Sequence, residues 1–111
     1  MMDVTPVVVL VTAGSEEEGQ QIGRALVEEG WAACVTLVPS VRSIFRWEGK
    51  ICEEGEVLLL IKSRRDVLDR IVERVKALHS YEVPEVIALS VVGGSEAYLK
   101  WVEEAVGVPD P

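Results

Sequence analysis

Residues 32–62 read AACVTLVPSVRSIFRWEGKICEEGEVLLLIK, and this stretch decides the fold. It contains two segments, 32–47 and 50–62, that are rich in β-branched and apolar side chains and are joined by Glu48 and Gly49. Such segments favour β-strands, and a two-residue connection with glycine in second place is typical of a tight hairpin turn. The sequence therefore predicts one long antiparallel hairpin at the centre of the chain.

The length of this hairpin sets it apart from the elements around it. An extended segment from 32 to 47 spans about 50 Å, whereas a helix over 65–78 covers only about 21 Å. The hairpin must therefore bend or project beyond the helices that pack on it. An arm with an apolar tip is expected to lie on a neighbouring subunit. The apolar side chains near the tip are Ile44, Phe45, Trp47 and Ile51.

The turn also fixes where the two cysteines lie. If the residues that flank the turn are paired, Cys52 lies opposite Phe45 and Cys34 lies opposite Ser63, with Pro39 as the site of a bulge that shifts this by a residue or two. The two sulfurs are then about 36 Å apart and cannot form a disulfide within one chain. We expect Cys34 to be a buried small apolar residue, and neither cysteine has visibly electropositive neighbours in the sequence.

The segments that flank the hairpin complete a β-α-β-β-α-β-α order. Ser15 followed by Glu18 is a capping box that begins a helix, and Gly30 is a typical stop. Right-handed crossovers in the two β-α-β halves favour an α+β, ferredoxin-like antiparallel sheet with helices on one face and an extra C-terminal helix. The remaining predicted elements are strand 6–12, helix 15–30, helix 65–78, strand 85–92 and a last helix that starts at Ser95 and stops at the tail 107–111.

Two predicted strands are apolar without interruption, at 7–11 and 57–61. A sheet covered by helices on one face only should alternate between apolar and polar side chains. Three helices of this length cover one face, so the second face must be buried by something else. Another copy of the same sheet is the simplest candidate, and a monomer is not expected.

Composition narrows the class of protein. The chain has 111 residues and a mass of 12.2 kDa, which fits a single domain over 1–111, and it carries a formal net charge of −8. That charge repels a phosphate backbone, so no nucleic-acid partner is expected. No apolar run approaches the roughly 20 residues that a membrane-spanning helix needs, so no membrane partner is expected. No export signal is visible, which favours a cytoplasmic location.

The only histidine, His79, lies in the segment KALHSYEVPEV at 76–86, and it supports two interpretations. An imidazole at the end of a helix can bond the free carbonyl groups there. Alternatively, His79 is a metal ligand that is completed by Glu82, Glu85 or groups of a neighbouring subunit. One imidazole with carboxylates makes a weak site for copper or another divalent cation, because strong copper sites usually have more nitrogen or sulfur ligands.

A pocket between subunits is a second possible use of this region. A catalytic site is not expected, because no nucleophile with a base and no oxyanion loop is recognisable. The residues that could line the pocket are Trp47, Lys62, Arg64, Tyr81 and Glu85.

Four segments together resemble one known family. LVEEGWAACVTLVPSVRSIFRWEGKI, VLLLIKSRRD, VKALHSYEVPEVIAL and YLKW are similar, in the same order over roughly residues 6–104, to the CutA family of divalent-cation tolerance proteins. The resemblance implies an interlocked homotrimer of ferredoxin-like subunits, similar in architecture to PII signalling proteins. It also implies a cytoplasmic protein linked to copper and other divalent metal ions, without established enzymatic activity.

The resemblance also points to a metal site. The copper site proposed for some bacterial members has a cysteine on the first strand and two adjacent histidines. Val11 and Leu78 stand at two of those positions here, His79 keeps the third, and Ser80 replaces the usual proline. The predicted function is metal-ion tolerance, with metal ions bound weakly or where subunits meet. The alternative is a PII-like signalling or scaffolding trimer that binds a non-metal small molecule or a protein.

Overall fold

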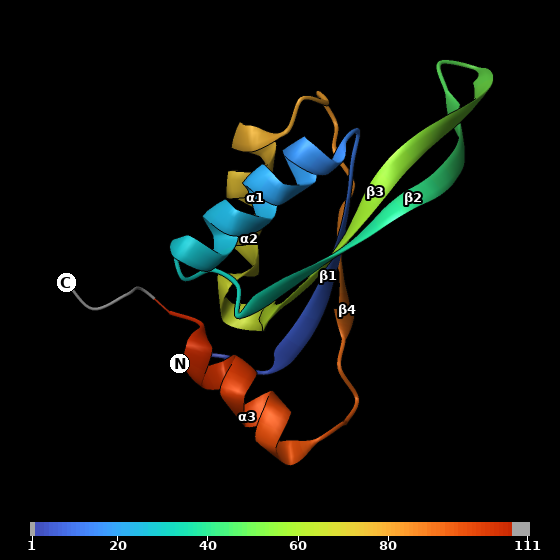
Figure 1. Ribbon diagram of the computed structural model, residues 1–111. Helices are drawn as coiled ribbons and strands as arrows, with labels where there is room; N and C mark the ends of the chain where they lie inside the picture. Colours follow the sequence, from blue (N-terminus) through green and yellow to red (C-terminus); the bar gives the residue numbers. More distant parts are fainter. Residues whose placement is uncertain (1, 108–111) are drawn as a thin grey trace.

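The computed structural model describes residues 2–107 and has the predicted order of elements (Figure 1). Within that range, no helix has the length and hydropathy that crossing a membrane requires. Residues 108–111 of the predicted tail lie outside the described part. The elements are β1 (Pro6–Ala13), α1 (Glu16–Glu28), β2 (Cys34–Trp47), β3 (Lys50–Arg64), a 3-10 turn (Arg65–Val67), α2 (Leu68–Leu78), β4 (Val86–Ser90) and α3 (Glu96–Ala105).

The four strands form one sheet in the order β2-β3-β1-β4. Each neighbouring pair is antiparallel, and β1 lies between β3 and β4. This is the strand order of a ferredoxin-like fold, as the sequence predicts. β4 ends at Ser90, two residues earlier than expected, where its pairing with Val7 of β1 ends.

The central hairpin has the predicted turn and an expected irregularity. Glu48 and Gly49 both have positive φ angles, of 50° and 78°, which is the conformation of a tight hairpin turn whose twist matches the strands. A bulge that includes Ser40, with a φ of 60°, shifts the register between Val38 and Val41. The hairpin is therefore continuous but changes register part-way along.

The bulge shifts the pairing partner of one of the two cysteines, Cys34, by one residue. Cys52 faces Phe45 as predicted, because this pair lies between the turn and the bulge. Cys34 lies beyond the bulge and faces Lys62, not Ser63. Ser63 instead points into the core, where its hydroxyl donates a hydrogen bond of 2.6 Å to the carbonyl of Trp31.

The far part of the hairpin projects beyond α1 and α2 as a two-stranded arm (Figure 1). β1 pairs with β3 only as far as Val57, so residues 50–56 pair with β2 alone. The predicted overhang is confirmed, and the longest dimension of the molecule is 43 Å. The large apolar side chains near the tip of the arm are exposed, with exposed fractions of 69 % for Ile44 and 65 % for Ile51.

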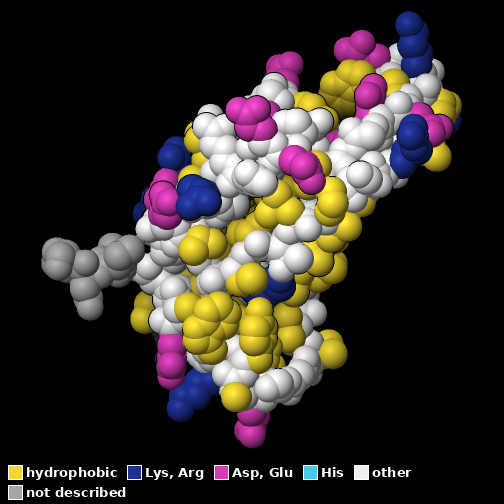
Figure 2. Space-filling model, in the orientation of Figure 1, with side chains coloured by type: hydrophobic (Ala, Val, Ile, Leu, Met, Phe, Trp, Pro, Cys, Tyr) yellow, Lys and Arg dark blue, Asp and Glu magenta, His cyan; other side chains and the backbone are white. Residues whose placement is uncertain are grey.

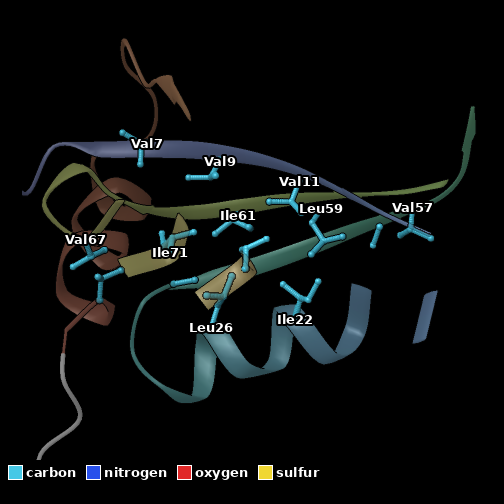
Figure 3. Close-up of a cluster of buried hydrophobic side chains, with 14 residues drawn as sticks. Val7, Val9, Val11, Ile22, Leu26, Val57, Leu59, Ile61, Val67 and Ile71 are labelled. Atoms are coloured by element: carbon cyan, nitrogen blue, oxygen red, sulfur yellow. The ribbon is translucent and has the colours of Figure 1, made fainter. Parts of the chain in front are cut away.

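The main core lies between one face of the sheet and the helices α1 and α2 (Figure 3). Each large apolar side chain buried there stabilises the fold by about 1.5 to 3 kcal/mol. Gly23 lets α1 approach the sheet, since a Cβ atom there would lie 3.0 Å from Cγ1 of Val35. Fully buried side chains of this core include Val9, Val11, Ile22, Leu26, Leu59, Ile61 and Ile71.

The second face of the sheet is also apolar, and α1 and α2 leave it uncovered. α3 packs on β3 and β1 over one end of this face, so the expectation that all helices lie on one face does not hold for α3. Figure 2 shows hydrophobic side chains gathered over the region of α3 and along the arm. Strand alternation places on this face Val8, Leu10, Leu58, Leu60, Ile87 and Leu89.

Candidate functional site

His79 ends α2 and turns its side chain into the molecule. The imidazole is fully buried, and Nε2 lies 2.7 Å from the carbonyl oxygen of Thr12 in β1. The backbone N–H of Tyr81 donates a 3.0 Å bond to Nδ1. A carbonyl only accepts, so a neutral ring with its proton on Nε2 satisfies both bonds. The predicted role of His79 at a helix end is thus realised with a carbonyl of β1, not with those of its own helix.

A carboxylate faces the same imidazole. Oε1 of Glu18 lies 3.5 Å from Nδ1 of His79 and is a buried oxygen without a hydrogen-bond partner among residues 2–107. Ser15 accepts the N–H of Glu18, as the predicted capping box requires. The Glu18 side chain, however, reaches His79. The residue that the sequence assigns to a helix start is therefore part of the buried polar cluster.

Tyr81 joins this cluster to the arm. Its hydroxyl donates a 2.9 Å hydrogen bond to Oε2 of Glu56, a buried residue of β3, and its ring lies 4.6 Å from the His79 ring. Gly14 leaves room for the ring, since a Cβ there would lie 3.3 Å from the phenol oxygen. Burial, followed by the hydrogen bond and negative charge of Glu56, raises the pKa of Tyr81 to about 12. We call His79, Glu18, Tyr81 and Glu56 the histidine cluster.

This shift predicts a pH dependence at the alkaline end. A raised phenol pKa contributes stability that is complete below the ordinary value of about 10 and is lost as the pH rises through about 12. Replacing Glu56→Gln keeps a hydrogen-bond acceptor and removes the charge, so the pKa of Tyr81 should fall toward 10. Phenolate absorbance, measured as the difference from Tyr81→Phe, follows this group alone. An unchanged pKa in Glu56→Gln would contradict the part of the shift that is assigned to the charge of Glu56.

The two other predicted metal ligands do not join His79. Glu82 and Glu85 are exposed, in the loop between α2 and β4, while the imidazole is buried. Among residues 2–107, no three His, Cys, Asp or Glu side chains lie close enough to hold a metal ion. A metal ion at His79 would have to displace the bond to Thr12 or to Tyr81. Val11, which the resemblance set against the strand cysteine of the copper site proposed for some bacterial members, is buried in the core.

The predicted pocket residues are spread over one chain. Trp47 lies at the tip of the arm, half exposed, whereas Arg64 ends β3 at the opposite end of the sheet. Lys62 is two residues before Arg64 on the same face, and Tyr81 is held in the histidine cluster. A single chain therefore does not bring these residues together, and a shared pocket needs arms from neighbouring chains.

Arg64 is engaged inside its own chain. Its guanidinium donates to both carboxylate oxygens of Asp66, at 2.9 and 2.6 Å, and to the carbonyls of Glu103 and Val106 at the end of α3. The bond to Asp66 raises the pKa of Arg64 above its ordinary value. This predicted pocket residue therefore fastens α3 to the sheet.

Comparison with known proteins places the chain in a family. A family model described as CutA1 divalent ion tolerance protein matches residues 7–105. The chain belongs to this family. It is 49 % identical over 100 residues to the divalent-cation tolerance protein CutA of Thermus thermophilus, a match that covers 90 % of this chain and 97 % of that protein. Chloroplastic protein CutA of Arabidopsis thaliana is 44 % identical over 102 residues.

Solved CutA structures share the fold of this CutA1 family member. The Thermus thermophilus protein superposes with a TM-score of 0.90 at 48 % identity, over 92 % of this chain and 99 % of the other. CutA1 from Oryza sativa superposes with a TM-score of 0.91 at 43 % identity, over 95 % and 96 %. Against the Arabidopsis relative, however, the matched region covers 92 % of this chain but just 56 % of the plant protein.

The structure of this CutA1 family member corrects the expected surroundings of Cys34. We expected a buried thiol without positive neighbours, but Cys34 is partly exposed and its Sγ lies 3.8 Å from Nζ of Lys62. The bulge produces this contact, because it moves the partner of Cys34 from Ser63 to Lys62, within the shift of a residue or two that was expected. Sequence reasoning also missed Glu18 and Glu56 in the histidine cluster, since each lies far along the chain from its partner.

Proposed function

We propose that this protein acts in divalent-ion tolerance as a homotrimer whose subunits cover one another's second face and arm. The observation that carries the proposal is the uncovered apolar face, where Ile87 and Leu89 are 51 % and 50 % exposed. Large apolar surfaces of this kind mark protein interfaces. The family match to divalent ion tolerance proteins supports the biological role. A cytoplasmic location and the lack of catalytic activity remain part of this proposal.

We further propose that divalent ions such as copper bind weakly, at positions where subunits meet. Only pairs of donor groups lie close together among the described residues of a single chain, and Glu82 and Glu85 are exposed to any neighbour. A metal ion bound by few ligands has low affinity, and a second subunit can supply the missing ones. His79 is the candidate nitrogen ligand, provided that the Tyr81 N–H releases Nδ1.

Copper titration of the chelator-treated protein by calorimetry tests the metal proposal. We expect saturable binding near one ion per subunit, and a loss of affinity of about tenfold or more in His79→Gln. Melting curves show whether that variant is folded. Glu82→Gln and Glu85→Gln probe the carboxylates, and Glu96→Gln on α3 is the control with the same change of charge.

Unchanged copper binding in His79→Gln would remove this residue from the site. A panel of nucleotides titrated in parallel tests the alternative. Nucleotide binding without any response to copper would favour the signalling trimer over the metal-binding one.

A further inference from the structure

The arm leaves the body of the sheet at the same level on both of its strands. On β3, the last residue that pairs with β1 is Val57, opposite Ala13. On β2, the bulge lies at this level, because the register changes between Val38 and the pair Val41–Glu56. Bulges bend a strand and interrupt its ladder of hydrogen bonds. Pairing on both sides of β3 is therefore interrupted at Val57, and we call this level the hinge of the arm.

Tyr81 bonds to the arm directly beyond the hinge. Its hydroxyl lies beside Gly14, the residue after β1, and donates the 2.9 Å hydrogen bond to Glu56. Among residues 2–107, this is the only side-chain hydrogen bond that joins 41–56 to the rest of the chain, since the other bond in the arm joins Arg42 to Glu53. Glu56 is also the one residue of 41–56 that is buried. A buried hydrogen bond to a carboxylate is a strong one, so Tyr81 is well placed to fix the direction of the arm.

Tyr81 is bonded at its other end to His79. Its backbone N–H donates to Nδ1, and the centroids of the two rings lie 4.6 Å apart. A neutral imidazole has one nitrogen lone pair free to accept, so Nδ1 cannot accept this N–H and bind a metal ion at the same time. A cation on Nδ1 must therefore displace the backbone of the residue whose hydroxyl holds Glu56.

The oxygen Oε1 of Glu18 favours a cation at this place. It lies 3.5 Å from Nδ1 of His79 and is buried without a hydrogen-bond partner among the described residues. A buried polar atom without a partner costs free energy, and a cation on Nδ1 would supply one. The gain at Glu18 offsets the loss of the Tyr81 N–H bond.

We propose that Tyr81 is a latch that fixes the arm at the hinge, and that a divalent cation on Nδ1 of His79 opens it. The opening by a cation rests on the proposed metal-binding function. In the closed state, Tyr81 is bonded to His79 and to Glu56; in the open state, the cation occupies Nδ1 and the arm turns about Val57. The arm lies on a neighbouring subunit in the proposed trimer, so metal binding in one subunit is transmitted to the next.

Hydrogen–deuterium exchange of the chelator-treated, full-length protein tests the latch. Tyr81→Phe keeps the ring and removes the hydroxyl, so peptides that cover 38–42 and 54–58 should exchange about tenfold faster or more. Glu56→Gln keeps an acceptor without its charge and should give a smaller increase. Tyr98→Phe, the same change on α3 near Cys34, should leave these peptides unchanged. Peptides within α2 show whether each variant keeps its fold.

The same measurement with copper tests the opening of the latch. Saturating copper should speed exchange at the hinge of the native protein and should have no further effect in Tyr81→Phe. Coupling between two sites is reciprocal, so calorimetry should show that Tyr81→Phe binds copper up to about tenfold more tightly than the native protein. The loss of a bond with a merely structural role would not raise the affinity for copper.

Exchange at the hinge that Tyr81→Phe leaves at the native rate would overturn the latch, and an arm that is held mainly by a neighbouring subunit gives this result. Copper that binds to the native protein without changing exchange at the hinge, or with equal affinity in Tyr81→Phe, would overturn the opening by a cation. A native protein that binds no copper refutes the proposed metal binding and the opening with it, while the metal-free comparison still decides the latch.

Discussion

Replacing Arg64→Met is expected to lower the free energy of unfolding by about 3 to 5 kcal/mol. Arg64 and Asp66 each have side chains that are only 12 % exposed and form a bidentate ion pair. Removing the arginine leaves the Asp66 carboxylate poorly solvated and without its partner. It also leaves the carbonyls of Glu103 and Val106 without the donor that holds α3 on the sheet.

Urea denaturation measures this loss, and an exposed ion pair in the same protein provides the control. Arg70 lies 3.6 Å from Glu73, with both side chains more than half exposed, so Arg70→Met should cost about 1 kcal/mol or less. Adding Asp66→Asn to Arg64→Met removes the stranded charge and should recover part of the stability. Equal effects of Arg64→Met and Arg70→Met would show that Arg64 does not fasten α3.

Replacing Leu89→Glu is expected to break the assembly. Leu89 is half exposed in one chain, and a charged residue there would cost a free monomer about 0.5 kcal/mol. If a neighbouring subunit covers the face, the same carboxylate is buried without a partner at a cost on the order of several kcal/mol for each subunit. The predicted result is a shift from trimer to monomer at micromolar concentration, measured by light scattering after size exclusion.

Val27→Glu is the matched control for this substitution. Val27 is similarly exposed, at 42 %, but lies on α1, on the other side of the sheet. The control should leave the mass of the assembly unchanged. A Leu89→Glu variant with the same mass as the native protein would show that this part of the face stays free.

The fold follows from local sequence signals to a large extent. The turn at Glu48 and Gly49, the helix start at Ser15 and the uninterrupted apolar strands are short-range patterns, and each predicts its element in the structure. The turn also fixes the pairing of the residues next to it, and Phe45 therefore faces Cys52 as predicted. The apolarity of both sheet faces is visible in the sequence as well, because strands alternate strictly between faces.

The remaining features depend on long-range packing. In the sequence, the capping box is a sufficient reason for Glu18 at the start of a helix. Its contact with His79 forms only when the chain folds. Pro39 marks the bulge in the sequence, but the direction and exact size of the register shift have no local signal, and the residue that pairs with Cys34 is Lys62 where an unshifted register gives Ser63. Arg64 holds α3 over the second face through the carbonyls of Glu103 and Val106, which lie about 40 residues after Arg64 in the sequence.

Sedimentation equilibrium of the native protein at micromolar concentration is the decisive test of whether neighbouring subunits cover the second face of the sheet. We expect a single species of about 37 kDa, three times the 12.2 kDa of one chain, that persists on dilution. A stable species of 12.2 kDa would mean that one chain tolerates its open apolar face and projecting arm in water, and the trimer and any pocket between subunits would have to be abandoned.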